Sequence, residues 1–143
     1  MSENARLVSI KCGQAIGPMI NRPSVEYTGH GNLLVFDGWA GRWFRANEKW
    51  VRDGVEKFIA DYKGDESGGD WVNYNDLYRN WGLEVVDCGA KFGYSPDEEY
   101  KQELNFEFTM CGPGTNLYEK MGEKVLLVEP SWDSMPWEGY MEV

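Results

Sequence analysis

Apolar residues between positions 48 and 62 recur at intervals of three and four, which is the spacing of one face of an α-helix. Charged residues fall on the opposite side, and Asn47 is a suitable N-cap. Gly54 interrupts this helix, and we expect it to mark a close approach of the helix to the sheet. A shorter helix is predicted over residues 75–81, where Gly82 ends it.

Beyond residue 82 the apolar residues alternate with polar ones, which predicts β-strands. Expected strands lie at residues 83–88, 100–110, 115–120, 123–129 and 138–143, with two earlier ones at 6–11 and 32–37. Strands in succession favour an antiparallel meander. The pattern therefore predicts a single α+β domain spanning 1–143. Its antiparallel sheet of about five to six strands, mostly C-terminal, packs against the main helix (about 48–62) and the short helix (about 75–81).

The segment LNFEFTMCGPGT, residues 104–115, joins an alternating strand to a turn. Alternation places Cys111 on the polar face of the strand. Pro113 and Gly114 suit the two corners of a type II turn, which predicts a hairpin. A nucleophile presented on a sharp elbow requires a helix after the strand. Because residues 115–120 read as another strand, we expect Cys111 to be no nucleophile.

The composition indicates a globular protein, since 42% of the residues are hydrophobic and 15% are aromatic. The first residues do not have the pattern of a signal peptide, and no apolar run is long enough to cross a membrane. We therefore expect a cytoplasmic protein. An odd number of cysteines, three, favours reduced thiols over a disulfide framework.

The net charge of −10 is concentrated in the C-terminal part of the chain. Residues 83–143 hold 13 Asp and Glu against four Lys and Arg. Such a surface repels phosphate backbones and anionic membranes and attracts basic partners. We expect a basic protein or a ribonucleoprotein complex as the partner, with no direct binding to nucleic acid or to a membrane. The alternative is that the acidity serves solubility alone.

Candidate catalytic and metal-binding residues are few. His30 is the one histidine, and it could act with Cys12, Cys88, Cys111 or a carboxylate in a small hydrolase or transferase. The cysteines lack the C-x₂₋₄-C spacing of zinc sites, and no phosphate-binding or dinucleotide-binding motif is present. We therefore expect no catalytic residue, no metal and no cofactor.

Two aromatic segments are candidates for a protein interface. Trp and Arg often carry binding energy at interfaces, and both occur in residues 39–45, although these residues equally suit a buried corner of the core. The tail after Pro130 alternates aromatic and acidic residues, which suits either a basic partner or the closing strand of the sheet. The predicted binding residues are Glu103, Glu107, Glu119, Trp132, Asp133, Trp137, Glu138, Tyr140 and Glu142.

In its size, its acidity and its lack of motifs, the chain resembles the small counter-defence proteins of phages and mobile elements, of the anti-CRISPR and anti-restriction type. The resemblance rests on general character and carries over no binding residue. It implies a non-enzymatic inhibitor in the host cytoplasm that occludes the DNA-binding or recruitment surface of a nuclease complex. Toxin-immunity proteins share this character, and a virion assembly protein is a further alternative.

Overall fold

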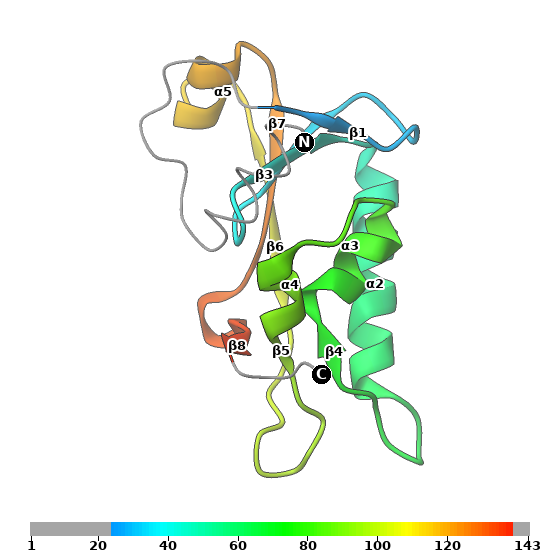
Figure 1. Cartoon of the computed structure of the whole chain (residues 1–143). Helices are drawn as coiled ribbons and strands as arrows, with labels where there is room; N and C mark the ends of the chain where they lie inside the picture. Colours follow the sequence, from blue (N-terminus) through cyan, green and yellow to red (C-terminus); the bar gives the residue numbers. More distant parts are fainter. Residues whose placement is uncertain (1–23, 139–143) are drawn as a thin grey trace. The chain divides into compact units, whose positions relative to one another are not determined.

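The computed structural model describes residues 24–138, which divide into two compact units. In the described part of the chain, unit 1 comprises residues 24–50 and 107–129, and unit 2 comprises residues 51–106 and 130–138. Helices and strands are both present, so the predicted α+β class is confirmed (Figure 1).

The sheet of unit 1 has five strands in the order β1-β3-β2-β7-β6. They are β1 (Glu26–Tyr27), β2 (Leu34–Asp37), β3 (Arg42–Arg45), β6 (Phe106–Cys111) and β7 (Val125–Pro130). All four residues of β2 are buried, which confirms the strand predicted within residues 32–37. The strand predicted at residues 6–11 lies outside the described residues.

This sheet is mixed, so the prediction of a purely antiparallel sheet is wrong. β2 pairs with β3 antiparallel, whereas β1 pairs with β3 parallel and β2 pairs with β7 parallel. The prediction assumed that strands adjacent in the sequence pair through short hairpins. Parallel partners need a long connection instead, and the chain between β2 and β7 is long enough to supply one.

The sheet of unit 2 has three strands, in the order β4-β5-β8, and both pairs are antiparallel. The strands are β4 (Val72–Asn73), β5 (Phe92–Tyr94) and β8 (Trp137–Glu138). β8 corresponds to the start of the closing strand predicted at residues 138–143, and residues 139–143 lie outside the described part.

Both predicted helices are present. The main helix, α2 (Glu48–Lys63), buries Val51, Val55, Phe58 and Tyr62, and the short helix, α3 (Tyr74–Trp81), has Asn73 as its N-cap. In unit 2 the Phe58 ring lies 6.0 Å from the ring of Tyr94, so α2 packs against β5. The close approach predicted at Gly54 is to Trp81 of α3, not to the sheet.

Two predicted strands are helical or irregular in the structure. Of residues 115–120, Thr115 is the N-cap and the others lie in the helix α5 (Asn116–Met121). The Thr115 hydroxyl accepts a hydrogen bond from the Tyr118 amide, and Gly122 ends the helix with a φ of 76°. Residues 83–88 contain no strand, and their last two begin the helix α4 (Asp87–Lys91). A 3₁₀ helix, η1 (Trp132–Ser134), completes the described elements.

Cys111 lies on the face of β6 that alternation predicted, with Glu107 and Thr109, but it is buried whereas those two residues are exposed. It packs in the core of unit 1, whose buried members are Leu34, Phe36, Trp43, Cys111, Met121 and Val125. The Cys111 side chain points away from the face of β6 that carries Phe106 and Phe108, as alternation predicts. At the C-terminal end of β6, the face that carries Cys111 packs in the core of unit 1. The strand predicted at residues 100–110 is shortened to β6.

The turn after Cys111 has the predicted form. The Thr115 amide donates a hydrogen bond to the Gly112 carbonyl oxygen at 3.1 Å, and Gly114 has a φ of 96°, as a type II turn requires. Because α5 follows, the turn joins a strand to a helix and is not a hairpin. Pro113 and Gly114 occupy its corners, so the thiol lies at the end of the strand and not at the apex.

The aromatic and arginine residues 39–45 belong to the core of unit 1, as one of the two interpretations predicted. Trp39, Trp43 and Phe44 are buried. The buried guanidinium of Arg42 donates two hydrogen bonds to the carboxylate of Glu26, at 2.6 and 2.9 Å. This segment therefore belongs to the core and stabilises the fold.

Candidate functional site

The residues predicted to bind a partner fall into three groups. Unit 2 holds five of them, and all five are exposed: Glu103, Trp132, Asp133, Trp137 and Glu138. Unit 1 holds two exposed carboxylates, Glu107 and Glu119. Tyr140 and Glu142 lie outside the described residues. The structure thus gathers five of the nine in unit 2.

The three-stranded sheet of unit 2 has a core face, and Trp137 lies on the opposite face. Val72 and Tyr94 lie opposite each other and are both buried, so they mark the core face. Trp137 lies opposite Gly93, one residue along from Tyr94, and therefore points to the other face. Because Gly93 has no side chain, no cross-strand side chain of β5 stands beside the Trp137 ring.

Residues 95–103, here named the acidic loop, are held closed by the hydroxyl of Tyr62. This hydroxyl donates a hydrogen bond to the carbonyl oxygen of Ser95 at 3.0 Å and accepts one from the amide of Gln102 at 2.9 Å. The Asp97 amide donates to the Ser95 hydroxyl at 3.2 Å. A single buried side chain from α2 therefore bridges the two ends of the loop.

The buried hydroxyl of Ser134 fixes the chain where the acidic loop ends. It donates a hydrogen bond to the carbonyl oxygen of Glu103 at 2.7 Å and accepts one from the amide of Asn105 at 3.0 Å. The Tyr94 hydroxyl in turn donates to the Ser134 carbonyl oxygen at 2.7 Å. These bonds join Glu103 to the segment that carries Trp132 and Asp133.

The acidic loop also contacts β8 through an aromatic pair. The rings of Tyr100 and Trp137 have their centroids 5.4 Å apart at an interplanar angle of 38°. Gln102 Nε2 donates to the carbonyl oxygen of Met135 at 3.3 Å. Tyr100, Met135 and Trp137, here named the aromatic face, remain 52%, 46% and 39% exposed.

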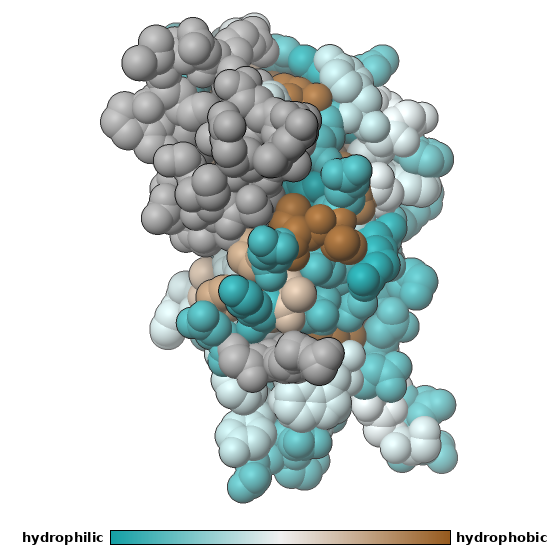
Figure 2. Space-filling view, in the orientation of Figure 1, coloured by the Kyte–Doolittle hydropathy of each residue, from teal (hydrophilic) through white to brown (hydrophobic). Residues whose placement is uncertain are grey.

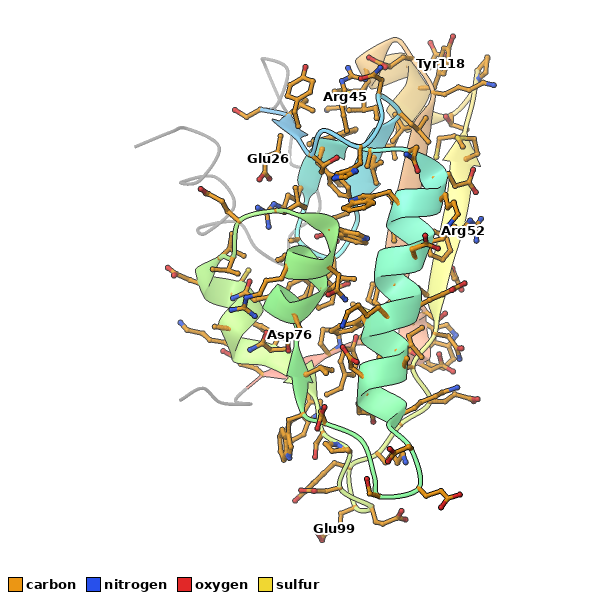
Figure 3. All side chains as sticks on the ribbon, turned by 90° about the vertical axis from the view of Figure 1, so that its right-hand side faces the viewer. Glu26, Arg45, Arg52, Asp76, Glu99 and Tyr118 are labelled. Atoms are coloured by element: carbon orange, nitrogen blue, oxygen red, sulfur yellow. The ribbon has the colours of Figure 1, made fainter. Side chains whose placement is uncertain are left out.

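The negative charge of the protein lies mainly in unit 2. Its described residues include 15 Asp and Glu against six Lys and Arg, whereas those of unit 1 include seven against five. Glu99 lies at the tip of the acidic loop (Figure 3). Figure 2 shows the acidic loop and the loop of residues 64–70 in teal and white, the colours of polar and intermediate residues.

The carboxylates of the acidic loop differ from those on the helices of unit 2. Asp61 pairs with Lys57 on α2, and Asp76 pairs with Arg79 on α3. Among the described residues, Asp97, Glu98 and Glu99 form no salt bridge, and all three are exposed. Their charge is therefore available to a partner.

No protein-family model matches the chain. Neither a curated protein nor a solved structure matches it. The support for a function therefore comes from the chemistry of the residues themselves.

A second group of carboxylates lies in the loop of residues 64–70. Asp65 Oδ1 accepts hydrogen bonds from the Ser67 hydroxyl at 2.6 Å and from the Ser67 amide at 2.9 Å. The bond from the hydroxyl is the largest of the causes that lower the pKa of Asp65 below its ordinary value. Asp65 therefore keeps its charge to a lower pH than an ordinary Asp.

His30 does not form a nucleophilic pair with Cys111. The His30 ring is exposed and stacks on the ring of Trp50 with centroids 3.5 Å apart, and its carbonyl oxygen accepts hydrogen bonds from Asn47. Cys111 is buried instead in the core of unit 1. The geometry of these two described residues thus offers no support for a hydrolase or transferase site.

The state of the cysteines differs from the prediction of reduced thiols. Cys88 is disulfide-bonded, so the prediction is wrong for Cys88. Cys111 is a free thiol, and burial raises its pKa above the ordinary value. Cys12 lies outside the described residues. A thiol that is kept protonated is a poor nucleophile, because the thiolate is the reactive form.

Within residues 24–138, no group of three or more His, Cys, Asp or Glu side chains is arranged to hold a metal ion. In the same part of the chain, no helix combines the length and the apolar composition needed to cross a membrane.

The acidic loop was not predicted from the sequence as part of the binding surface, although three successive exposed carboxylates lie there. Asp97, Glu98, Glu99 and Tyr100 were assigned to a break between strands and to the start of a strand, not to a binding site. The signal was present, because three successive carboxylates precede an aromatic residue. Their contact with β8 depends on a segment more than 30 residues later, which alternation within one strand does not reveal.

Proposed function

We propose that this protein is a non-enzymatic acidic binding protein that inhibits a basic, nucleic-acid-handling partner by occluding its surface. The observation that carries this proposal is the acidic loop of unit 2, which presents unpaired carboxylates from a backbone clamped by Tyr62 and Ser134. A nuclease or its recruitment complex uses basic surfaces to hold phosphates. The acidic loop competes for such a surface.

Electrostatics supports a macromolecular partner. An excess of nine carboxylates over cations in one compact unit produces a field that speeds the approach of a basic surface and repels nucleic acid. Because the backbone of the acidic loop is already fixed, binding loses less conformational entropy than it would with a flexible loop. Both properties suit an inhibitor that must reach its target before nucleic acid does.

The resemblance in size and acidity to anti-CRISPR and anti-restriction proteins agrees with this chemistry. In such a role the protein acts in the cytoplasm of the host cell, where the target enzyme works. The partner is a basic protein or a ribonucleoprotein complex, and the contact is between protein surfaces.

The experiment is capture from bacterial lysate treated with nuclease, at low and at moderate salt, followed by mass spectrometry. The proposal expects recovery of a stoichiometric, basic, nucleic-acid-processing enzyme, whose cleavage of its nucleic acid substrate is then inhibited by the purified protein. Recovery of no such enzyme by the folded protein, or recovery without inhibition, contradicts the proposal.

A matched pair of variants distinguishes the acidic loop from the rest of the surface. Glu98→Gln with Glu99→Gln removes two charges from the loop, and Glu107→Gln with Glu119→Gln removes two exposed charges from unit 1. The proposal assigns binding to unit 2, and thus differs from the sequence prediction for Glu107 and Glu119. It expects weaker capture with the loop variant and nearly unchanged capture with the unit 1 variant. The reverse order would place the binding surface on unit 1.

A further inference from the structure

We propose that the aromatic face and the acidic loop together form a receptor for arginine side chains of the partner. This inference rests on the proposed function and specifies the partner's chemistry. An arginine-rich protein segment would place a guanidinium against the exposed rings of Tyr100 and Trp137 while a neighbouring carboxylate of the acidic loop accepts its hydrogen bonds.

Exposed aromatic rings and unpaired carboxylates occur together on the acidic loop and β8. Tyr100 follows Asp97, Glu98 and Glu99 directly in the chain and contacts Trp137 with its ring. Glu138 follows Trp137, and it too is exposed. Each of the two rings therefore has at least one exposed carboxylate next to it in the sequence, and these carboxylates are available to a cation that approaches the rings.

The surface is fixed before a ligand arrives. The ring contact, the bond from Gln102 to the Met135 carbonyl oxygen and the Tyr62 clamp all hold the acidic loop against β8 or α2. Binding then immobilises few additional side chains, so that more of the contact free energy appears as affinity.

Arginine fits this surface better than lysine. A guanidinium is planar, stacks on aromatic rings and matches a carboxylate with two parallel hydrogen bonds. The ammonium of lysine is more strongly hydrated and offers a point charge. Trp is the best cation–π partner among the aromatic residues, and one such contact at an exposed site is worth roughly 2- to 5-fold in affinity.

The test is the anisotropy of two fluorescein-labelled peptides of equal charge, nona-arginine and nona-lysine, titrated with the full chain. We expect nona-arginine to bind at least about 3-fold more tightly, which corresponds to about one cation–π contact. Trp137→Leu should abolish most of this preference, and Trp137→Phe should retain part of it because a ring remains. Tyr27→Leu is the matched control, because Tyr27 is an exposed aromatic residue (72%) that belongs to unit 1 and lies outside the aromatic face and the acidic loop.

Equal affinity for the two peptides overturns the inference, as does an arginine preference that survives Trp137→Leu in a folded variant. Far-UV circular dichroism checks the fold of each variant, and Trp137→Phe decides the outcome if Trp137→Leu unfolds. The proposed function fails separately. If the protein prefers arginine but inhibits no nucleic-acid-processing enzyme, the function is wrong and the inference stands. If it inhibits such an enzyme without an arginine preference, the inference is wrong and the function stands.

Discussion

The hydroxyl of Tyr62, at the end of α2, donates a 3.0 Å hydrogen bond to the carbonyl oxygen of Ser95. The Tyr62 hydroxyl oxygen accepts a 2.9 Å hydrogen bond from the amide of Gln102. One phenol therefore satisfies a backbone acceptor and a backbone donor that lie seven residues apart. This arrangement gives the acidic loop a fixed shape without secondary structure of its own.

Tyr62→Phe should loosen the acidic loop. The substitution leaves the Ser95 carbonyl and the Gln102 amide without their common partner, and we expect a loss of about 1–3 kcal/mol in the free energy of unfolding. Urea denaturation measures this loss, and hydrogen exchange at the Gln102 amide should accelerate. Tyr118→Phe is the matched control in unit 1. Equal stability and equal exchange in Tyr62→Phe would show that the hydroxyl does not hold the loop.

Gly54→Ala should destabilise the protein, although Ala is normally favoured over Gly inside a helix by about 1 kcal/mol. A Cβ at this position would lie 2.5 Å from Trp81 Cδ1. The Trp81 ring is buried and donates a hydrogen bond to the Val51 carbonyl oxygen, so it has little freedom to move. We expect a loss of about 1–3 kcal/mol from overpacking.

The control for this substitution is Gly112→Ala, because no atom lies within 4 Å of a Cβ built at Gly112. Thermal or urea unfolding of both variants gives the comparison. A Gly54→Ala protein that is as stable as the Gly112→Ala protein, or more stable than the parent, would contradict the close approach of α2 to Trp81.

Cys111 should react slowly with thiol reagents at neutral pH, because it is buried and burial raises its pKa.

The Cys111 thiol holds its proton more tightly in the folded state than in the unfolded state. The protonated Cys111 thiol therefore makes its full contribution to the free energy of unfolding below the pKa of the unfolded state, about 8.5. This contribution decreases as the pH rises through the higher pKa of the folded state. The difference in unfolding free energy between the parent and Cys111→Ala, measured from pH 7 to 10, should narrow with increasing pH. A difference that is independent of pH would contradict the raised pKa.

The sequence was sufficient to predict elements whose information is local. The apolar spacing in residues 48–62 predicts α2, and Gly82 ends α3 as predicted. The continuous apolar run before Asp37 predicts the buried strand β2. Each of these elements is determined by residues within its own segment.

The errors arose where a second segment decides the outcome. Residues 115–120 are an exception, because they alternate like a strand although the caps that form α5, Thr115 and Gly122, lie within or directly beside the same segment. Cys111 is on the face opposite Phe106, as alternation requires, yet only the packing of Met121 and its neighbours shows that this face is buried. Parallel pairing of β2 with β7 likewise depends on residues about 90 positions apart.

The proposed binding surface likewise combines residues that the local sequence predicts with contacts that depend on distant segments. Acidic and aromatic residues were identified in the C-terminal segment from composition, and Glu103, Asp133, Trp137 and Glu138 indeed lie in the acidic unit. The contribution of Tyr100 depends on its contact with Trp137, which the sequence does not encode as a local pattern. The anchoring Tyr62 and Ser134 look in the sequence like ordinary members of a helix face and a polar tail.

The salt dependence of binding to the captured partner tests the central claim most directly. The affinity of the parent should fall as the salt concentration rises from 50 to 300 mM, and the decrease should be shallower for Glu98→Gln with Glu99→Gln, because fewer charges take part. Glu107→Gln with Glu119→Gln should keep the parent's slope. An affinity that is independent of salt, or an unchanged slope in the loop variant, would contradict an electrostatic interaction through the acidic loop.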